Sequence, residues 1–270
     1  SMPTPQVETV KLDELNCWRI RHGDAELLVA QQGAHILSYQ VAGQQPLIWL
    51  NDEAVFKRGK SIRAGVPVCW PWFGNFARNP QAVQAMRQGT DPAPAHGLVR
   101  ATDWELLGIE SQGDSLLVEL RLPCPAGGFP GWPHQVEPRL SIRLDQQLHI
   151  SLSSHNLGTE SVSISQALHS YFAVSDVRQV QVEGVDGLSY IETLEDWKTK
   201  VQSGSLHFTG ETDRIYLNAP TQLEIVDPDW QRRIRLSSEG SRTAVIWNPW
   251  IDRAAQFSDM ADDGLSLIHI

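Results

Sequence analysis

The stretch "LSIRLDQQLHISL", residues 140–152, consists of two runs in which apolar and polar residues alternate. Apolar residues occupy every second position on both sides of the polar "DQQ" at 145–147: Leu140, Ile142, Leu144, Leu148, Ile150 and Leu152. Successive side chains of a strand point to opposite faces of a sheet, so each run predicts a half-buried strand. The stretch as a whole therefore predicts an antiparallel β-hairpin.

Similar alternation recurs along the chain. Further runs lie at 116–122, at 162–174 and on both sides of the turn "PDWQ" at 228–231. Turn residues are spaced by roughly ten positions, and no long run has the period of a helix. Short strands at such regular spacing predict an all-β protein, a large antiparallel β-sandwich or a barrel.

No linker interrupts this pattern, so we expect one β domain over residues 1–270. The most loop-like part is residues 74–95, "GNFARNPQAVQAMRQGTDPAPA", in which "AVQAMR" could form a helical turn. A loop of this length in a compact domain is usually functional or disordered. We expect this loop to set which ligand the protein prefers.

The charge of the chain restricts its partners. Its formal net charge is −10, and no run of Lys or Arg is longer than Arg232–Arg233. A protein that binds phosphate backbones needs a basic face, so we expect no nucleic-acid partner. An anionic ligand would have to be held by a few well-placed arginines.

Apolar segments and cysteines indicate the compartment. No apolar segment approaches the ~18 residues of a membrane span, and the N-terminus lacks a signal pattern, so we expect no membrane partner. The three cysteines, Cys17, Cys69 and Cys124, are an odd number without metal-like spacing. They are expected to be reduced, buried thiols, which favours a cytoplasmic protein, and their spacing predicts no metal site. The oligomeric state cannot be read from the sequence.

"RAGVPVCWPWFG", residues 63–74, places one arginine at the head of a rigid aromatic and proline-rich segment. Arg63 could pair with a carboxylate at the rim of a sheet. A guanidinium held beside rigid backbone is also suited to a planar anion such as phosphate or carboxylate. Arg58 and Lys60, just upstream, could add to the same positive charge.

Two further motifs contain histidines. "AHGLVR", residues 95–100, sets His96 and Arg100 four residues apart, either as a satisfied loop histidine or as part of an anion site. "ALHSYF", residues 167–172, sets His169 in an apolar strand. Most such histidines are structural, but histidine also transfers protons near neutral pH.

The last two motifs are "ETDRIY", residues 211–216, and "WNPW", residues 247–250. The first offers Asp213 beside Arg214, which could be a surface ion pair. The second is a rigid aromatic turn, suited either to stacking on sugar rings or to filling a core. Each of these signals is weak alone.

The motifs resemble, in order and spacing, those of the hexose-6-phosphate mutarotases (glucose-6-phosphate 1-epimerases) of the aldose-epimerase, galactose-mutarotase-like superfamily. The resemblance runs from about residue 20 to residue 261. It implies a galactose-mutarotase-like β-supersandwich that interconverts the α and β anomers of a hexose 6-phosphate without a cofactor or a metal.

The same resemblance assigns roles to five residues. It makes Arg63 and Arg100 the phosphate-binding arginines, with His96 on the sugar hydroxyls. It makes His169 the catalytic acid and Asp213 the group that binds the ring hydroxyls. Mutarotation also requires a base, for which a carboxylate is expected.

The sequence departs from the family pattern near its end. The family's catalytic glutamate follows "MAD" by several residues, whereas this chain reads "FSDMADDGLSLIHI" from 257 to 270 and has no glutamate there. We therefore expect a chain truncated at its C-terminus. The alternative function is a non-catalytic protein that binds sugar phosphate.

Overall fold

The computed structural model describes residues 6–52, 54–257 and 264–270. Contacts within the chain divide it into two compact units. Unit 1 comprises Ser1–Gln44 and Val55–His169, and unit 2 comprises Gln45–Ala54 and Ser170–Ile270. Antiparallel sheets make up both units, which confirms the all-β fold class. The expectation of a single domain stays a prediction.

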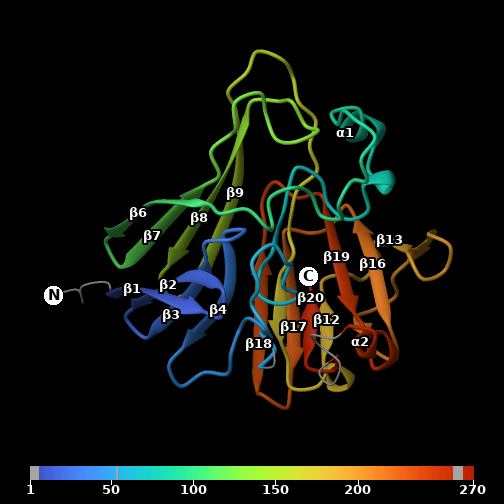
Figure 1. Ribbon diagram of the computed structural model, residues 1–270. Coiled ribbons are helices and arrows are strands. Elements are labelled where there is room, and N and C mark those ends of the chain that lie inside the picture. The colour runs from blue at the N-terminus through green and yellow to red at the C-terminus, as the bar shows by residue number, and fades with distance from the viewer. Residues whose placement is uncertain (1–5, 53, 258–263) are drawn as a thin grey trace. The chain divides into compact units, whose positions relative to one another are not determined.

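Unit 1, in its described part, contains two four-stranded antiparallel sheets, whose strands are labelled in Figure 1, and a two-stranded sheet. The first sheet follows chain order: β1 (Gln6–Leu12), β2 (Leu15–His22), β3 (Ala25–Ala30) and β4 (His35–Val41). So does the second: β6 (Glu105–Gln112), β7 (Ser115–Arg121), β8 (Val136–Leu144) and β9 (Leu148–Asn156). The small sheet pairs β5 (Val68–Cys69) with β10 (Ala167–Leu168). The helical turns are Phe76–Arg78, a 3-10 turn, and α1 (Gln81–Gln84).

The hairpin predicted at 140–152 is confirmed as β8 and β9. Leu144 lies opposite Leu148 across the turn, and Leu140 opposite Leu152. Leu140 and Ile142 are buried, as are alternate residues of the neighbouring strand β7. Burial of a large aliphatic side chain contributes roughly 1.5–3 kcal/mol, so this alternating apolar face stabilises the sheet.

Unit 2 contains a six-stranded and a four-stranded sheet in its described part. The order of the larger sheet is β11 (Tyr171–Ala173), β20 (Leu267–His269), β19 (Thr243–Asn248), β16 (Thr212–Leu217), β13 (Ser189–Glu192) and β14 (Lys198–Val201). The order of the smaller sheet is β15 (Leu206–His207), β12 (Gln181–Glu183), β17 (Gln222–Asp227) and β18 (Arg232–Ser237). Strands β17 and β18 form the hairpin predicted around "PDWQ". The helical turns are Val177–Gln179, a 3-10 turn, and α2 (Asp252–Ala255).

The continuous strand expected over 162–174 was wrong. Residues 161–166 are not a strand, and His169 follows β10 rather than lying inside a strand. Side chains replace the ladder here: the Phe73 amide donates to Ser165 Oγ (3.0 Å), and Ser154 Oγ donates to Gln166 Oε1 (3.2 Å). The side chains of Ser165 and Gln166 thus have hydrogen-bond partners although these residues are not paired in a strand. Alternation of apolar and polar residues does not show such contacts, so it predicted a strand that is not there.

The aromatic segment 63–74 is anchored in the core of unit 1. Trp70 and Trp72 are fully buried, and their indole N–H groups donate to Ser154 Oγ (2.9 Å) and to the Pro94 carbonyl (2.8 Å). Trp70 also packs edge-on against Trp132 at 5.2 Å between ring centroids. The loop 74–95 is tied down at this end, and the helical turn expected in it is α1.

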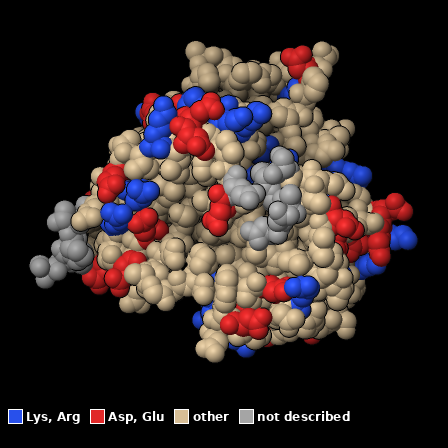
Figure 2. Space-filling view, turned by 60° about the horizontal axis from the view of Figure 1, so that its bottom comes forward, with Lys and Arg blue, Asp and Glu red and all other residues tan. Residues whose placement is uncertain are grey.

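The structure also bears on the expectations about surface charge, membrane spans and cysteines. Lys and Arg side chains lie interspersed with Asp and Glu on the face shown in Figure 2. No helix of the described residues is long and apolar enough to cross a membrane. All three cysteines are free thiols, with Cys17 and Cys69 buried as expected but Cys124 only half-buried. The cytoplasmic location stays a prediction.

Candidate functional site

Arg63 stands at the exposed start of the aromatic segment, between the buried residues Ile62 and Ala64. Its backbone is therefore fixed while its side chain reaches outward. Arg58 does not add its charge freely to this position, because it donates two hydrogen bonds to the Asp103 carboxylate (3.3 and 3.1 Å). The expectation that Arg58 adds to the positive charge of Arg63 was therefore wrong, because Asp103 neutralises Arg58.

His96 is held by two hydrogen bonds to one residue. Its amide donates to the Gly74 carbonyl (3.0 Å), and the Gly74 amide donates to His96 Nδ1 (3.1 Å). Because Nδ1 accepts a hydrogen bond, it carries no proton, and the neutral ring has its proton on Nε2. His96 is thereby set up as a donor at Nε2.

The turn that carries His96 leaves no room for a side chain at its next position. Gly97 has φ +87°, and a Cβ there would lie 2.0 Å from the Trp70 carbonyl oxygen. His96 itself has φ +63°, in the left-handed region that non-glycine residues rarely adopt. The Leu98 amide donates to the same Trp70 carbonyl (2.8 Å), so buried Trp70 fixes this turn.

His96 and His169 lie side by side against Phe73. The ring centroids of the two histidines are 5.0 Å apart, and Phe73 is 5.2 Å from His96 and 5.9 Å from His169. His169 is placed by strand β10 and by its amide, which donates to the Pro67 carbonyl (2.9 Å). Sequence reasoning did not assign Phe73 a role of its own, and its signal was only its place in the aromatic segment.

Two positive charges act on His96. Its pKa is lowered from 6.5 to about 4, first by burial and then by the charges of Arg100 and Arg63. Arg100 is half-buried and donates to the Ala95 carbonyl (2.8 Å). Unit 1 therefore brings together four of the five predicted residues. With Phe73, they form what we call the arginine–histidine site: Arg63, Phe73, His96, Arg100 and His169.

Asp213, the fifth predicted residue, belongs to β16 in unit 2 and faces a cavity of about 480 Å³. This volume falls within the range of small-molecule sites. We call it the Asp213 pocket, and its lining residues supply two indole rings and several polar groups: Thr193, Leu194, Trp197, Glu211, Asp213, Trp247, Arg253 and Gln256. Of these, the sequence analysis had singled out only Asp213 and the Trp247 motif.

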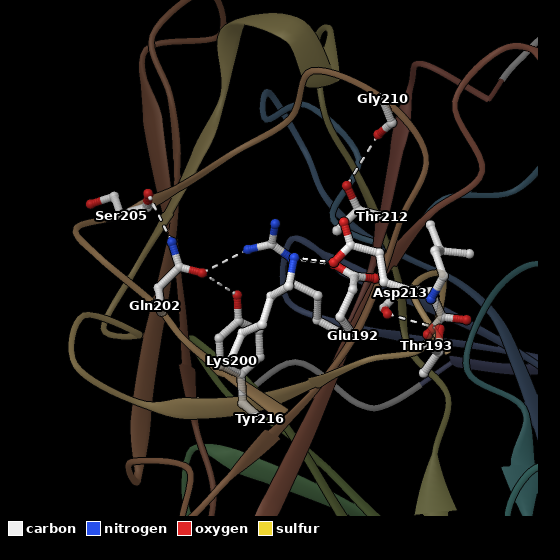
Figure 3. Close-up of polar contacts among 12 residues, drawn as sticks. Glu192, Thr193, Lys200, Gln202, Ser205, Gly210, Thr212, Asp213 and Tyr216 are labelled. Atoms are coloured by element: carbon white, nitrogen blue, oxygen red, sulfur yellow. Dashed lines mark hydrogen bonds and ion pairs between the residues drawn. The ribbon is translucent and has the colours of Figure 1, made fainter. Parts of the chain in front are cut away.

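Burial raises the pKa of Asp213 from 3.8 to about 6. The Thr193 hydroxyl opposes this shift, while the charges of Glu192 and Glu211 add to it. Figure 3 shows Thr193 and Asp213 side by side, where the Thr193 hydroxyl donates to the Asp213 carbonyl (2.9 Å). The carboxyl of Asp213 can therefore change its charge near neutral pH.

Arg214 does not form the surface ion pair with Asp213 that was considered from the sequence. It pairs with Glu192 (3.4 Å) and donates to Gln202 Oε1 (2.8 Å). The Tyr216 hydroxyl donates to the same Gln202 oxygen (2.7 Å; Figure 3). This network fixes strand β16 beside Asp213 and leaves the aspartate to the pocket.

The aromatic turn "WNPW" serves two purposes in unit 2. Trp247 lines the Asp213 pocket, as a residue that contacts a sugar ring would. Asn248 is fully buried and donates to the Gly264 (2.7 Å) and Leu267 (2.8 Å) carbonyls. The segment with the missing glutamate begins in residues 258–263, which lie outside the described residues.

A family match accounts for this combination of motifs. The aldose 1-epimerase family matches residues 16–266. The chain belongs to the aldose 1-epimerase family. It is therefore an epimerase, a type of isomerase, and the resemblance found in the motifs is confirmed.

Individual relatives support this membership. A protein of Escherichia coli K12, named a candidate glucose-6-phosphate 1-epimerase, is 34% identical and is aligned over 97% of this chain and 83% of its own. A candidate mutarotase from Salmonella typhimurium has a similar structure, with a TM-score of 0.86 at 29% identity over 97% of this chain and 84% of its own. A galactose mutarotase-like protein from Clostridium acetobutylicum shares the fold (TM-score 0.72, 17% identity, 99% and 88% covered).

The raised pKa of Asp213 predicts a pH-dependent stability. A folded-state pKa near 6, against 3.8 in the unfolded chain, means that the protonated form stabilises the fold below pH ~4 and that this stabilisation is lost as the pH rises through 6. Wild type should therefore lose stability between pH 4.5 and pH 7, whereas Asp213→Asn, which has no carboxyl at this position, should not lose this contribution. The unfolding free energy of Asp213→Asn minus that of wild type should thus be about 1–3 kcal/mol larger at pH 7 than at pH 4.5.

Urea unfolding at the two pH values measures this difference. Asp229→Asn is the matched control, because Asp229 is an exposed carboxylate of the same unit and should follow wild type at both. If the difference in unfolding free energy between Asp213→Asn and wild type were the same at both pH values, the raised pKa of Asp213 would be contradicted.

Proposed function

We propose that this chain interconverts the α and β anomers of a hexose 6-phosphate, with D-glucose 6-phosphate as the first substrate to test. The observation that carries the proposal is the contact of His96 with His169 and Phe73, at 5.0 and 5.2 Å between ring centroids, in a part of unit 1 where the charges of Arg100 and Arg63 also act on His96. The names of the relatives in Escherichia coli and Salmonella typhimurium support the choice of glucose 6-phosphate.

Phosphate recognition follows from the arginines. A guanidinium offers a planar fork of donors that matches phosphate oxygens, and two of them in an acidic protein give a local site for an anion. His96, neutral and protonated at Nε2, would donate to a sugar hydroxyl without repelling the arginines. A protonated histidine in its place would add a third positive charge.

The reaction needs two proton transfers. A base removes the proton of the anomeric hydroxyl while an acid protonates the ring oxygen, the ring opens, the C1–C2 bond rotates, and the ring closes on the other face. We assign His169 as the acid and Asp213 to the ring hydroxyls. The proton acceptor is expected to be a carboxylate.

Replacing Arg63 by alanine should selectively weaken phosphate binding. Arg63→Ala should cost roughly 2–4 kcal/mol of binding free energy for glucose 6-phosphate, the range for losing a charge-assisted contact. The weak binding of unphosphorylated glucose should hardly change. Isothermal titration calorimetry with both sugars decides, and equal losses for the two would reject a phosphate role for Arg63.

His169→Asn should separate catalysis from binding. Anomer exchange of glucose 6-phosphate, followed by NMR or polarimetry, should slow at least ~10²-fold because the proton donor is lost. Binding by calorimetry should be largely kept, since asparagine retains a polar group of similar size. Near-normal exchange in this variant would make His169 a packing residue and place the acid elsewhere.

A further inference from the structure

The turn between β3 and β4, residues 31–34, contacts one of the two segments that carry the phosphate-binding arginines. Gln32 in this turn is almost fully buried, at 3% exposure. Its Oε1 accepts from the Gly59 amide (2.9 Å), and its Nε2 donates to the Lys60 carbonyl (3.3 Å). Both halves of the amide thus hold the chain just before Arg63.

His35, at the start of β4, holds the same segment just after Arg63. Its Nε2 donates to the Ala64 carbonyl (2.6 Å), which fixes the proton on that nitrogen. The Val66 amide donates to the Ile36 carbonyl (2.8 Å) next to it. Burial, and then the charge of Arg100, lower the pKa of His35 to about 4, so it stays neutral.

The same turn also holds the segment that carries Arg100. The Gly33 amide donates to the Thr102 carbonyl (2.8 Å), and the Trp104 amide donates to the Gln31 carbonyl (2.9 Å). A Cβ on Gly33 would lie 2.7 Å from the Arg100 carbonyl oxygen, so the two backbones are in close contact. One short turn therefore touches both arginine segments.

An ion pair joins the two segments directly. Arg58 precedes Arg63 and Asp103 follows Arg100, and the Arg58 guanidinium binds both carboxylate oxygens of Asp103. Such a two-point contact fixes orientation as well as distance. The two segments are thus tied to the turn and to each other.

We infer that Gln32, His35 and the Arg58–Asp103 ion pair form a clamp that positions Arg63 relative to Arg100. This inference rests on the proposed function, in which these two arginines bind phosphate. Selectivity for a phosphorylated sugar then depends on residues that do not touch the ligand, because contacts of guanidinium forks to phosphate are sensitive to geometry. Gln32 and His35 are positioning residues.

The clamp is tested by whether Asp103→Ala weakens or strengthens the binding of glucose 6-phosphate. Asp103→Ala should weaken glucose 6-phosphate binding about 5–10-fold, as should Arg58→Ala, and the double variant should lose no more than either single one. Binding of unphosphorylated glucose should stay within twofold. If Arg58 instead contacted phosphate itself, Asp103→Ala would release its charge and strengthen binding, which would overturn the clamp.

Controls separate the possible failures. Arg21→Ala removes comparably exposed ion pairs, with Glu26 (2.9 Å) and Glu8 (3.1 Å), at the end of the β2–β3 pairing opposite to the turn at 31–34. It should leave the ratio of the two dissociation constants unchanged. A wild-type protein without preference for glucose 6-phosphate would refute the proposed function. A wild-type preference that survives in Arg58→Ala and Asp103→Ala would refute the clamp alone.

Gln32→Leu extends the test to the buried part of the clamp. It should reduce the preference for glucose 6-phosphate and also lower the melting temperature, because the Gly59 amide and the Lys60 carbonyl lose their partner. A lower melting temperature with an unchanged preference would limit Gln32 to stability and overturn its positioning role. If this variant does not fold, the two exposed variants decide the outcome.

Discussion

Gly74 and His96 exchange two hydrogen bonds, and the arginine–histidine site depends on this contact. Arg63 begins the segment that ends at Gly74, and Arg100 follows four residues after His96. The contact therefore joins the two parts of the chain that supply positive charge. It is possible only because Gly97 lets the backbone approach the Trp70 carbonyl.

Burial then determines the charge of His96 and of Asp213. Removing a group from water disfavours its charged form, which lowers the pKa of His96 and raises that of Asp213. His96 is neutral at pH 7 and donates from Nε2, while Asp213, with a pKa of about 6, can accept or release a proton near neutrality. One physical cause thus yields a fixed donor in unit 1 and a titrating carboxyl in unit 2.

The strands were predictable because alternation is a local property. The hairpin at 140–152 and the one around "PDWQ" needed only the pattern of their own residues. The site needed more. His96 and His169 are 73 positions apart, and only the ordered set of motifs predicted that both belong to one site. The strand at 162–174 failed because side-chain hydrogen bonds, which alternation cannot show, replace the ladder there.

The clamp could not be predicted from the sequence. Gln32 is one glutamine among many in the chain, and its partners Gly59 and Lys60 become neighbours only in the fold. From the sequence, Arg58 was expected only to add positive charge near Arg63. In the structure it binds Asp103, which lies 45 positions later in the chain. The pKa of Asp213 likewise depends on burial within the folded unit.

The protonation state of His96 tests the account most directly. ¹⁵N NMR of the imidazole across pH 4–8 distinguishes the two neutral tautomers and the cation. We predict a neutral ring with its proton on Nε2 throughout the upper part of this range, because the Gly74 amide occupies Nδ1. We predict titration near pH 4, because burial and then the charges of Arg100 and Arg63 disfavour the positively charged ring. A proton on Nδ1, or titration at the ordinary value near 6.5, would contradict the account.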